Sequence, residues 1–530
     1  MHRQTYISDI SIIALLTLAL SLSVFSGLFG SDEVTYTYRA LLLTEGDWSM
    51  SSYIGGTRLG MNIPVAFFMW LFGDNLYAAN LWPLLTSVGE VVLVYILGRD
   101  LWGRKAGLFA ATILALTPIH LNYAGSLMAD APLAFFITLS FALFYFAEKT
   151  QSIRLYILSG LSIGFVYWIK ETVIIYSLVF ALYPLISRQW KKQWLLVALA
   201  AILMVLLNCL VMLILTGDPL YLLNVVRIAV AKNNVDLERT RGILFYPHFL
   251  FLDIKHTWLL GYLALAGIAS LLIRPGRMRG DDSGNQFMLL WVISLPLLFT
   301  FFVTPSPPYL LIPKQTNYML IFIAPLALCS GYLLAKVSNK LAGTLLLFFV
   351  SGGFVLSTLE QQAIIVFVAN SKAAIEFKRA HPKAIVYGSI NAGRIAFLAD
   401  KLEKGHGQLT IRYLNDLDKI NCHYLCNLNT NRDVFIIVDS QTQEWVSSSP
   451  EIYSSIATMS KRCLIPQGIL HPLGFALGYL VLDGIRQILS ISHIKISVID
   501  DVIKRYLLPT SAVVYKMNPS CKGEQLETTG

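Results

Sequence analysis

Long runs of hydrophobic residues, separated by short polar segments, dominate the first 360 residues of the chain. A helix needs about 20 mostly apolar residues to cross the hydrocarbon core of a bilayer. Eleven segments meet or nearly meet this length and are predicted to span the membrane: residues 10–29, 76–97, 106–123, 130–147, 154–169, 171–187, 194–216, 256–274, 286–303, 316–336 and 341–359. The first is longer than the core of a signal peptide and no small-residue cleavage site follows it, so we predict that it is retained.

Lysine and arginine are concentrated in every second loop between these segments. Cytoplasmic loops are enriched in both residues, so the alternation predicts a cytoplasmic N-terminus. The loops predicted to be cytoplasmic contain Arg99, Arg104 and Lys105; Lys149 and Arg154; Arg188, Lys191 and Lys192; Arg274, Arg277 and Arg279; and Lys336 and Lys340. The opposite loops, which include residues 30–75 and 217–255, are then extracytoplasmic.

An odd number of spans places the tail beyond residue 360 on the extracytoplasmic face. In this tail "AIVYGS" and "DVFIIVDS" have the pattern of short strands, and "NAGRIAFLADKL" between them has the pattern of a helix. We therefore predict a mainly α protein with two domains. Residues 1–360 form a polytopic bundle of membrane helices, and residues 361–530 form a small extracytoplasmic α/β accessory domain.

Two features of the tail leave alternatives open. Residues 467–488 form a run long enough to enter the membrane, although His471, Pro472, Asp483 and Arg486 favour a packed amphipathic helix. The turn "SINAGR" follows a predicted strand and opens a predicted helix, but a single glycine is too weak a motif to indicate a nucleotide site.

The cysteines bear on the compartment. Cys209 and Cys329 lie within predicted spans and are expected to be small apolar side chains. "CHYLC" lacks the second pair of ligands typical of a zinc site, so no metal site is predicted. In an oxidising compartment the four cysteines of the tail permit up to two disulfides, with three connectivities: Cys422, Cys426, Cys463 and Cys521.

Composition agrees with a membrane protein. Of the 530 residues 55% are hydrophobic and only 14% charged, against about 25% charged in an average soluble domain. The net charge of +9 arises from short clusters between apolar runs. We interpret it as membrane topology, and no nucleic acid partner is expected.

Ionisable residues gather at the predicted outer ends of the spans. Such groups cost about 2.5–3.5 kcal/mol each at membrane depth, so those present are candidates for function. The acidic candidates are Asp32, Glu33 and Asp130, and the basic candidates are Arg58, Lys170 and Lys314.

Each candidate also has a structural alternative. Asp130, with Pro132 two residues later, has the pattern of a helix N-cap. Lys170 and Lys314 could extend toward the membrane surface as ordinary interfacial anchors. Glu33 could favour the first turn of a surface helix. These structural roles can explain each residue alone, but they explain less well why three carboxylates and three cations gather at the outer ends of different spans.

Converging charges of both signs suit one kind of chemistry. Fixed cations stabilise the negative charge that develops on a lipid-linked phosphate as it leaves a sugar. An ionised carboxylate on the other side of the sugar takes the proton of the acceptor. Such a displacement without a covalent intermediate inverts the anomeric carbon, by analogy with glycosidases.

The segment "AFFMWLFG" at residues 66–73 is too short to span a bilayer and is rich in aromatic residues. This composition is typical of a helix that lies in the membrane interface, where it could shape an entry for a polyprenyl chain. A packed loop helix has the same pattern, so both alternatives stay open.

Several motifs, in order, resemble a known family: "SDEVTYTYRA", "GGTRLGMNIPVAFFMWLFGDNLYAANLWPLL", "VYILGRDLWGRKAGLFAATILALTP", "SLMADAPLAFF", "WIKET" and "KQTNYMLIFIAPLALCSGYLL". Together they resemble the bacterial branch of the dolichyl-phosphate-mannose protein mannosyltransferases and the related aminoarabinose transferases of lipid A. These are integral-membrane glycosyltransferases of the GT-C class. The resemblance covers roughly residues 5 to 340.

The resemblance implies roles for individual residues. Asp32 matches the acidic position taken as the catalytic base, with Glu33 beside it, and Asp130 matches a second acidic position. Lys170 matches a lysine associated with the lipid phosphate. Tyr318, with Lys314 before it, lies where the family has a basic-and-tyrosine pattern.

The chain departs from the family in two places. The family often has Lys-Pro-Pro in the first outer loop, where this chain has Arg58 and, six residues later, Pro64. Arg58 is nevertheless the candidate there for contact with the phosphate. The tail after residue 360 matches no part of the family, and choice of acceptor could reside in it.

These observations predict a multi-pass glycosyltransferase of the cytoplasmic membrane. It would move a sugar from a polyprenyl-phosphate donor to a protein, lipid or glycan acceptor at the outer face. No nucleotide site is required; a divalent cation is compatible with the chemistry, but no isolated ligand set is evident. A transporter or flippase of lipid-linked sugars is the alternative, which predicts repeats and charges near the bilayer midplane. A non-catalytic scaffold would leave the clustered carboxylates unexplained.

Overall fold

The computed structural model of the chain describes residues 2–171, 173–232, 242–273, 282–303, 309–414, 432–439, 463–470, 477–491 and 511–518. It divides into two compact units. Unit 1 comprises Met1–Phe25, Arg39–Gly73 and Tyr77–Ser357, and unit 2 comprises Ser26–Tyr38, Asp74–Leu76 and Thr358–Gly530. Each unit is described by itself.

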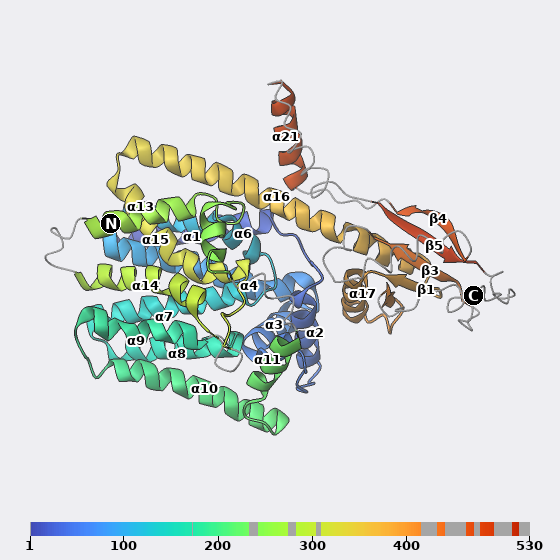
Figure 1. Ribbon diagram of the computed structural model, residues 1–530, viewed down its shortest axis with the longest axis horizontal. Helices are drawn as coiled ribbons and strands as arrows, with labels where there is room; N and C mark the ends of the chain where they lie inside the picture. Colours follow the sequence, from blue (N-terminus) through green and yellow to red (C-terminus); the bar gives the residue numbers. More distant parts are fainter. Residues whose placement is uncertain are drawn as a thin grey trace. The chain divides into compact units, whose positions relative to one another are not determined.

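Unit 1 is a bundle of helices (Figure 1). Its first half contains α1 (His2–Ser23), part of α2 (Asp32–Thr44), the 3₁₀ helix η1 (Ile54–Thr57), α3 (Leu59–Phe72), α4 (Leu76–Trp102), α5 (Arg104–Ala115), α6 (Pro118–Ala124), α7 (Asp130–Thr150) and α8 (Ile153–Ile169). Its second half contains α9 (Val173–Ser187), α10 (Trp194–Thr216), α11 (Tyr221–Lys232), α12 (Phe245–Phe251), α13 (Leu260–Ile273), α14 (Asp282–Phe301), the 3₁₀ helix η4 (Thr316–Met319), α15 (Leu320–Lys336) and the start of α16 (Asn339–Ala380).

The predicted membrane bundle is confirmed. Every predicted span overlaps a helix, and among the described residues seven helices are long and apolar enough to cross a bilayer. Three predicted spans fall on the shorter apolar helices α8, α9 and α13, which have 17, 15 and 14 residues. The aromatic segment at residues 66–73 forms the second half of α3, and its Phe67, Trp70 and Phe72 are exposed.

Three predicted boundaries were wrong, two of them for local reasons. The span predicted at residues 106–123 is broken into α5 and α6, which meet at 67°, because Pro118 lacks an N–H and holds Thr117 extended. The first helix ends at Ser23, since Gly27 and Gly30 follow it with positive φ. The last helix, α16, continues 21 residues beyond the predicted end at residue 359.

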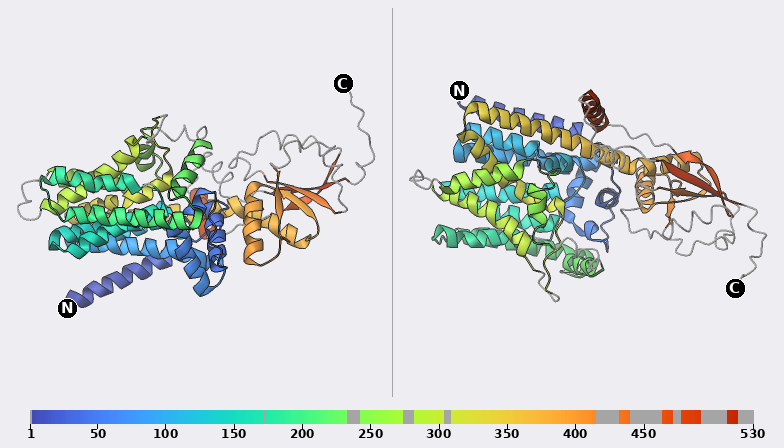
Figure 2. Two further views of the ribbon diagram at one scale, coloured as in Figure 1. Left: turned by 90° about the horizontal axis from the view of Figure 1, so that it is seen from below. Right: turned by 45° about the horizontal axis from the view of Figure 1, so that its top comes forward.

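Small residues let neighbouring helices of the bundle approach closely. A Cβ added to Gly331 of α15 would lie 2.6 Å from backbone atoms of Ala106 and Ala110 in α5. Close backbone packing through glycine and alanine is typical of helices in membranes, where apolar burial alone does not drive association. α15 is among the most buried of the candidate spans, with most of its residues inside the protein. In contrast α1, on the outside of the bundle, is mostly exposed (Figure 2).

Unit 2 contains a five-stranded mixed sheet with the order β2-β1-β3-β5-β4. Its strands are β1 (Ile385–Gly388), β2 (Ile411–Tyr413), β3 (Val434–Val438), β4 (Leu464–Leu470) and β5 (Ala512–Met517). β1 pairs parallel with β2 and β3, whereas β5 pairs antiparallel with β3 and β4. The helix α17 (Ile390–Leu402) connects β1 to β2. The predicted strands "AIVYGS" and "DVFIIVDS" and the predicted helix between them are thus confirmed.

The hydrophobic core of unit 2 includes a segment from the start of the chain. Leu28 and Val34 are buried in one cluster with Val386, Ile395 and other residues from α16, β1 and α17. The contact-based boundary between the units therefore falls between Ser357 and Thr358, and it assigns the distant residues 26–38 to unit 2. The predicted domain limits of 1–360 and 361–530 place this segment in the first domain, and they stay a prediction.

Other predictions for the tail have mixed outcomes. For the run at residues 467–488 a packed amphipathic helix was favoured. Residues 467–470 instead belong to strand β4, and the described remainder from residue 477 lies in helix α21 (Leu477–Ile491). Cys463 is disulfide-bonded, whereas Cys209 and Cys329 are free. Cys422, Cys426 and Cys521, with His471 and Pro472, lie outside the described residues.

Candidate active site

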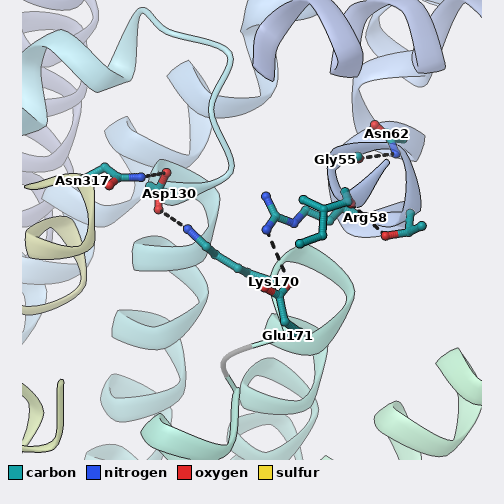
Figure 3. Close-up of polar contacts among 9 residues, drawn as sticks. Gly55, Arg58, Asn62, Asp130, Lys170, Glu171 and Asn317 are labelled. Carbon is teal, nitrogen blue, oxygen red and sulfur yellow. Dashed lines mark hydrogen bonds and ion pairs between the residues drawn. The ribbon is translucent and has the colours of Figure 1, made fainter. Parts of the chain in front are cut away.

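Asp130 lies at the centre of a buried polar cluster in unit 1. Its Oδ1 accepts a hydrogen bond from Lys170 Nζ at 2.8 Å, and its Oδ2 accepts one from Asn317 Nδ2 at 2.8 Å (Figure 3). The alternative of a helix cap for Asp130 was wrong, because Ala129 is the N-cap of α7 and no side chain caps it. The carboxylate instead connects the start of α7 to the segments before α9 and α15.

Lys170 is placed by the end of α8. Its N–H closes the last helical turn on Val166, and its own backbone is extended (φ −157°, ψ 136°), which ends the helix. The Nζ lies 4.2 Å from the centre of the Tyr318 ring, so the ammonium has an aromatic face as well as a carboxylate beside it. The Lys170 side chain is only 6% exposed, which does not fit an anchor that reaches for the membrane surface.

Arg58 approaches the same region from the N-terminal end of α3. Its guanidinium lies 3.4 Å from Oε2 of Glu171, the residue after Lys170 (Figure 3). This distance is at the upper limit for a hydrogen bond, so the Arg58–Glu171 pair is weaker than the Lys170–Asp130 pair. Because both members of each pair are mostly buried, removal of one would leave a poorly solvated charge.

The motif "GGTRLG" brings Arg58 to this place. The side chain of Asn62 donates to the carbonyls of Gly55 and Gly56 and thereby fixes the turn before Arg58. A Cβ on Gly60 would lie 2.8 Å from the backbone of Trp168, so α3 and the end of α8 are in close contact. This contact places Arg58 near Lys170, although 112 positions separate them in the sequence.

The segment before α15 supplies Asn317 and Tyr318 to the cluster, and Lys314 precedes them in the sequence. Lys314 is fully buried, which argues against the role of an interfacial anchor. Tyr318 in η4 lies under Lys170, and Asn317 beside it binds Asp130. The structure thus gathers in unit 1 the predicted residues Asp130, Arg58, Lys170 and Tyr318, with Lys314 four positions before Tyr318.

Asp32 and Glu33 lie in unit 2, at the first two positions of α2. Asp32 is half-buried, whereas Glu33 is buried. Oε1 of Glu33 accepts hydrogen bonds from the backbone N–H groups of Phe29, Gly30 and Ser31, at 2.5, 2.5 and 3.1 Å. Burial raises the pKa of Glu33 above its ordinary value of 4.5, although these hydrogen bonds act in the opposite direction. The contacts support the helix-end alternative for Glu33. They connect the first turn of α2, which includes Asp32, to the backbone of residues 29–31.

Sequence reasoning missed several polar residues that are buried or partly buried. Glu171 and Asn317 stand next to predicted residues within the quoted motifs "WIKET" and "KQTNYML", so their position was the available signal. Glu90 of α4 is buried beside His120, with 3.5 Å between Oε2 and Nε2, and accepts a hydrogen bond from Thr138. A carboxylate within an apolar run is costly in a membrane, and this signal could have identified Glu90.

Among the residues that the structure describes, no three histidine, cysteine, aspartate or glutamate side chains lie close enough together to hold a metal ion. The acidic and basic side chains of the cluster are instead paired with one another. Arg58 and Lys170 are thus held in place as cations that could bind an incoming anion.

Known proteins resemble the chain in sequence and in fold. Residues 62–214 match the family model of dolichyl-phosphate-mannose-protein mannosyltransferase. An undecaprenyl phosphate-alpha-4-amino-4-deoxy-L-arabinose arabinosyl transferase of Yersinia enterocolitica is 25% identical over 333 residues, which are 59% of this chain and 56% of that protein. The homologous enzyme of Pseudomonas paraeruginosa is 25% identical over 337 residues, 58% of this chain and 56% of its own. The chain thus matches little more than half the length of these curated relatives.

The solved structures extend the likeness in fold to nearly the whole chain. ArnT from Cupriavidus metallidurans in the apo state has a TM-score of 0.57 at 16% identity, covering 99% of this chain and 100% of that one. In sequence the chain is thus similar, over part of its length, to dolichyl-phosphate-mannose-protein mannosyltransferases and to arabinosyl transferases, and it shares the fold of ArnT.

Proposed function

We propose that the protein is an inverting glycosyltransferase that moves a sugar from a polyprenyl-phosphate donor to an acceptor at the outer face of the cytoplasmic membrane. The observation that carries the proposal is the cluster of paired charges at helix ends in unit 1. The names of the relatives support the donor class: one curated relative is an undecaprenyl-phosphate-dependent transferase, and ArnT of Cupriavidus metallidurans has been solved bound to undecaprenyl phosphate, at a TM-score of 0.52 and 15% identity.

The cations of unit 1 would hold the phosphate of the donor. When the bond between the anomeric carbon and the phosphate oxygen breaks, negative charge accumulates on the departing lipid phosphate. Arg58 and Lys170 would stabilise that charge, and Tyr318 and Lys314 would complete the site. In this proposal Asp130 orients Lys170 rather than acting as the base, since both of its oxygens already accept hydrogen bonds.

The weaker of the two pairs is the one that the phosphate would open. Arg58 is 3.4 Å from Glu171, whereas Lys170 is 2.8 Å from Asp130. Guanidinium binds phosphate through two parallel N–H groups, so exchange of Glu171 for phosphate would strengthen the contacts of Arg58. Lys170 would keep its carboxylate partner and use its remaining N–H groups.

Asp32 would be the base. It would take the proton of the acceptor while the acceptor oxygen or nitrogen attacks the anomeric carbon, and the lipid phosphate would leave with its electron pair. Asp32 suits this role better than Glu33, because Glu33 is buried and engaged with three backbone N–H groups. The acceptor, whether protein, lipid or glycan, is assigned to no residue.

The orientation of the protein supports an extracytoplasmic site. The far end of α7 carries Lys149 paired with Asp100, and Arg104 at the start of α5 pairs with Asp9, in agreement with a cytoplasmic face enriched in basic residues. The disulfide at Cys463 fits an oxidising compartment for unit 2. We therefore propose that the candidate site and the C-terminal α/β domain are extracytoplasmic.

Transfer of a labelled sugar tests the proposal. The full chain, purified in detergent, is incubated with a radiolabelled polyprenyl-phosphate sugar and a membrane extract that supplies acceptors. Wild type should transfer label, and Asp32→Asn should not. Asp47→Asn is the matched control, because Asp47 is exposed, lies in the same predicted outer loop and accepts a hydrogen bond from the N–H of Ser49. Full transfer by Asp32→Asn would remove Asp32 from the role of base.

The same preparation distinguishes a transporter. If no donor supports transfer but the reconstituted protein moves a polyprenyl-phosphate sugar between the leaflets of vesicles, the proposal fails and the flippase alternative is supported. The candidate charges argue against that outcome, since Asp130, Lys170 and Arg58 all lie at ends of helices.

A further inference from the structure

Residues 28–34 comprise the turn before α2 and the first residues of that helix, including Asp32, and we call them the Asp32 loop. Apolar contacts build this loop into the C-terminal domain. Leu28 and Val34 are 8% and 6% exposed and belong to the same core cluster as the first helix and strand of that domain. The ring of Phe29 stacks on Phe367 of α16 at 4.7 Å between centroids. Apolar side chains therefore hold the loop on both sides of Asp32.

A second set of contacts joins this loop to the first turns of α17. Arg394 donates from its guanidinium to the carbonyl of Ser31, the residue before Asp32, at 2.8 Å. Gly30 lies directly against Asn391, because a Cβ at Gly30 would lie 1.7 Å from Oδ1 of that side chain. Gly30 also has a φ of +94°, which side chains other than glycine rarely adopt.

α17 is itself fixed at this end. The hydroxyl of Ser389 accepts a hydrogen bond from the N–H of Ala392 and so caps the helix. Asn391 is fully buried and donates to Ser371 of α16. The turn "SINAGR", which sequence alone could not assign, thus presents a rigid surface on which the loop lies. All of these contacts are within unit 2.

We propose that the C-terminal domain is a working part of the transferase, and that Arg394 is a positioning residue which sets the place of Asp32 through the Ser31 carbonyl. This inference rests on the proposed role of Asp32 as the base.

Steady-state kinetics of the full chain test the inference. Arg394→Ala should lower kcat by about tenfold to a hundredfold, since small misplacements of a reacting group cost that much. The KM for the labelled donor, and the affinity for polyprenyl phosphate measured directly, should stay within about twofold, because donor binding depends on unit 1. Arg394→Lys retains a donor for the Ser31 carbonyl and should recover most of kcat. A merely structural residue would not separate kcat from KM in this way.

A pair of glycines gives an independent test. Gly27 and Gly30 both have positive φ, +77° and +94°, but a Cβ at Gly27 meets no atom within 4 Å. Both substitutions strain the backbone, but only the Cβ of Gly30→Ala would meet Asn391. Gly30→Ala should therefore lower kcat far more than Gly27→Ala. Adding Asn391→Ala to Gly30→Ala removes the atoms that the new Cβ would meet, and kcat should rise toward that of Gly27→Ala. Such a gain cannot come from misfolding.

The outcomes separate this inference from the function on which it rests. Full activity of Asp32→Asn would overturn the assignment of the base. If Asp32→Asn is inactive but Arg394→Ala keeps full kcat, only the positioning role is overturned. Equal losses in Gly27→Ala and Gly30→Ala, with no recovery in the double variant, would also overturn it.

Discussion

Lys170 and Asp130 form an ion pair of 2.8 Å in which the two side chains are only 6% and 2% exposed. They come from the end of α8 and the start of α7, 40 positions apart. The pair thus joins two helix ends at one place and leaves the remaining N–H groups of the ammonium for other partners.

Removal of one partner should destabilise the protein strongly. Lys170→Met would leave the Asp130 carboxylate buried without its cation, and we expect a loss of about 3–5 kcal/mol in the free energy of unfolding. The double variant Lys170→Met/Asp130→Leu should recover most of that stability but not donor binding. Thermal unfolding in detergent and binding of polyprenyl phosphate measure the two effects.

The matched control lies on the same helix. Lys149 pairs with Asp100 at the far end of α7, where the side chains are 45% and 29% exposed. Lys149→Met should cost less than about 1 kcal/mol, because exposed pairs contribute little. If Lys149→Met and Lys170→Met lowered the free energy of unfolding equally, burial would not explain the cost at Lys170.

Glu171 should compete with the donor phosphate for Arg58. Glu171→Gln removes the competing charge while it keeps the size of the side chain, so we expect severalfold tighter binding of polyprenyl phosphate. Arg58→Gln should weaken the same binding. Equilibrium titration of the purified protein with the lipid phosphate measures both. Glu45→Gln, at an exposed position, is the control and should not change the affinity for polyprenyl phosphate. Unchanged affinity in Glu171→Gln would remove Arg58 from the phosphate site.

Glu33 should stabilise the loop of Asp32 as an acceptor. Glu33→Gln keeps an oxygen for the three backbone N–H groups, whereas Glu33→Ala leaves them unsatisfied and should cost about 1–3 kcal/mol or more. Melting temperatures of the two variants test this difference. Similar melting temperatures would indicate that the three hydrogen bonds contribute little.

Glu33 should also make stability depend on pH. Its pKa in the folded protein is raised above 4.5 by burial. Between the unfolded and folded values the unfolded chain has lost a proton that the folded chain keeps, so stability falls as pH rises through this interval. The contribution is fully present below the unfolded pKa. Subtracting the melting curve of Glu33→Gln, which does not titrate, isolates this slope; a difference that rises with pH would contradict it.

The proposed orientation predicts accessibility at two exposed positions. A cysteine at Glu45 should react with a membrane-impermeant maleimide in intact cells stripped of any outer barrier. A cysteine at Gln189, in the loop before α10, should react only after the cytoplasmic membrane is permeabilised. Mass spectrometry of the labelled peptides detects each modification. The reverse pattern would place the candidate site on the cytoplasmic face.

Local sequence patterns predicted the elements of the fold well but not their partners. Hydrophobic length located the helices, and the bend between α5 and α6 was available from Thr117 and Pro118. The contact between Arg58 and Glu171 joins residues 113 positions apart. It depends on how α3 packs against α8, for which the sequence offers only the small size of Gly60.

The end of the first apolar run shows a different limit. The prediction assigned Leu28 and Phe29 to a membrane span because they continue a hydrophobic run. In fact Leu28 is buried in the core of unit 2, and Phe29, which is partly buried, packs against that core. An apolar side chain is removed from water equally by lipid or by a protein core, so hydrophobicity alone could not distinguish the two. The likeness in motif suggested Asp32 as the base, a role that stays a prediction, but it did not predict that Asp32 belongs to unit 2.

The membership of residues 26–38 in unit 2 has a consequence for synthesis of the chain. Phe29 and its stacking partner Phe367 are 338 positions apart, so at about 5–20 residues per second the ribosome needs roughly 20–70 s to make the second after the first. Throughout that interval Leu28, Phe29 and Val34 lack the surface on which they finally pack. The loop that bears the proposed base would therefore be among the last parts of the molecule to mature, and a candidate for protection by a chaperone during export.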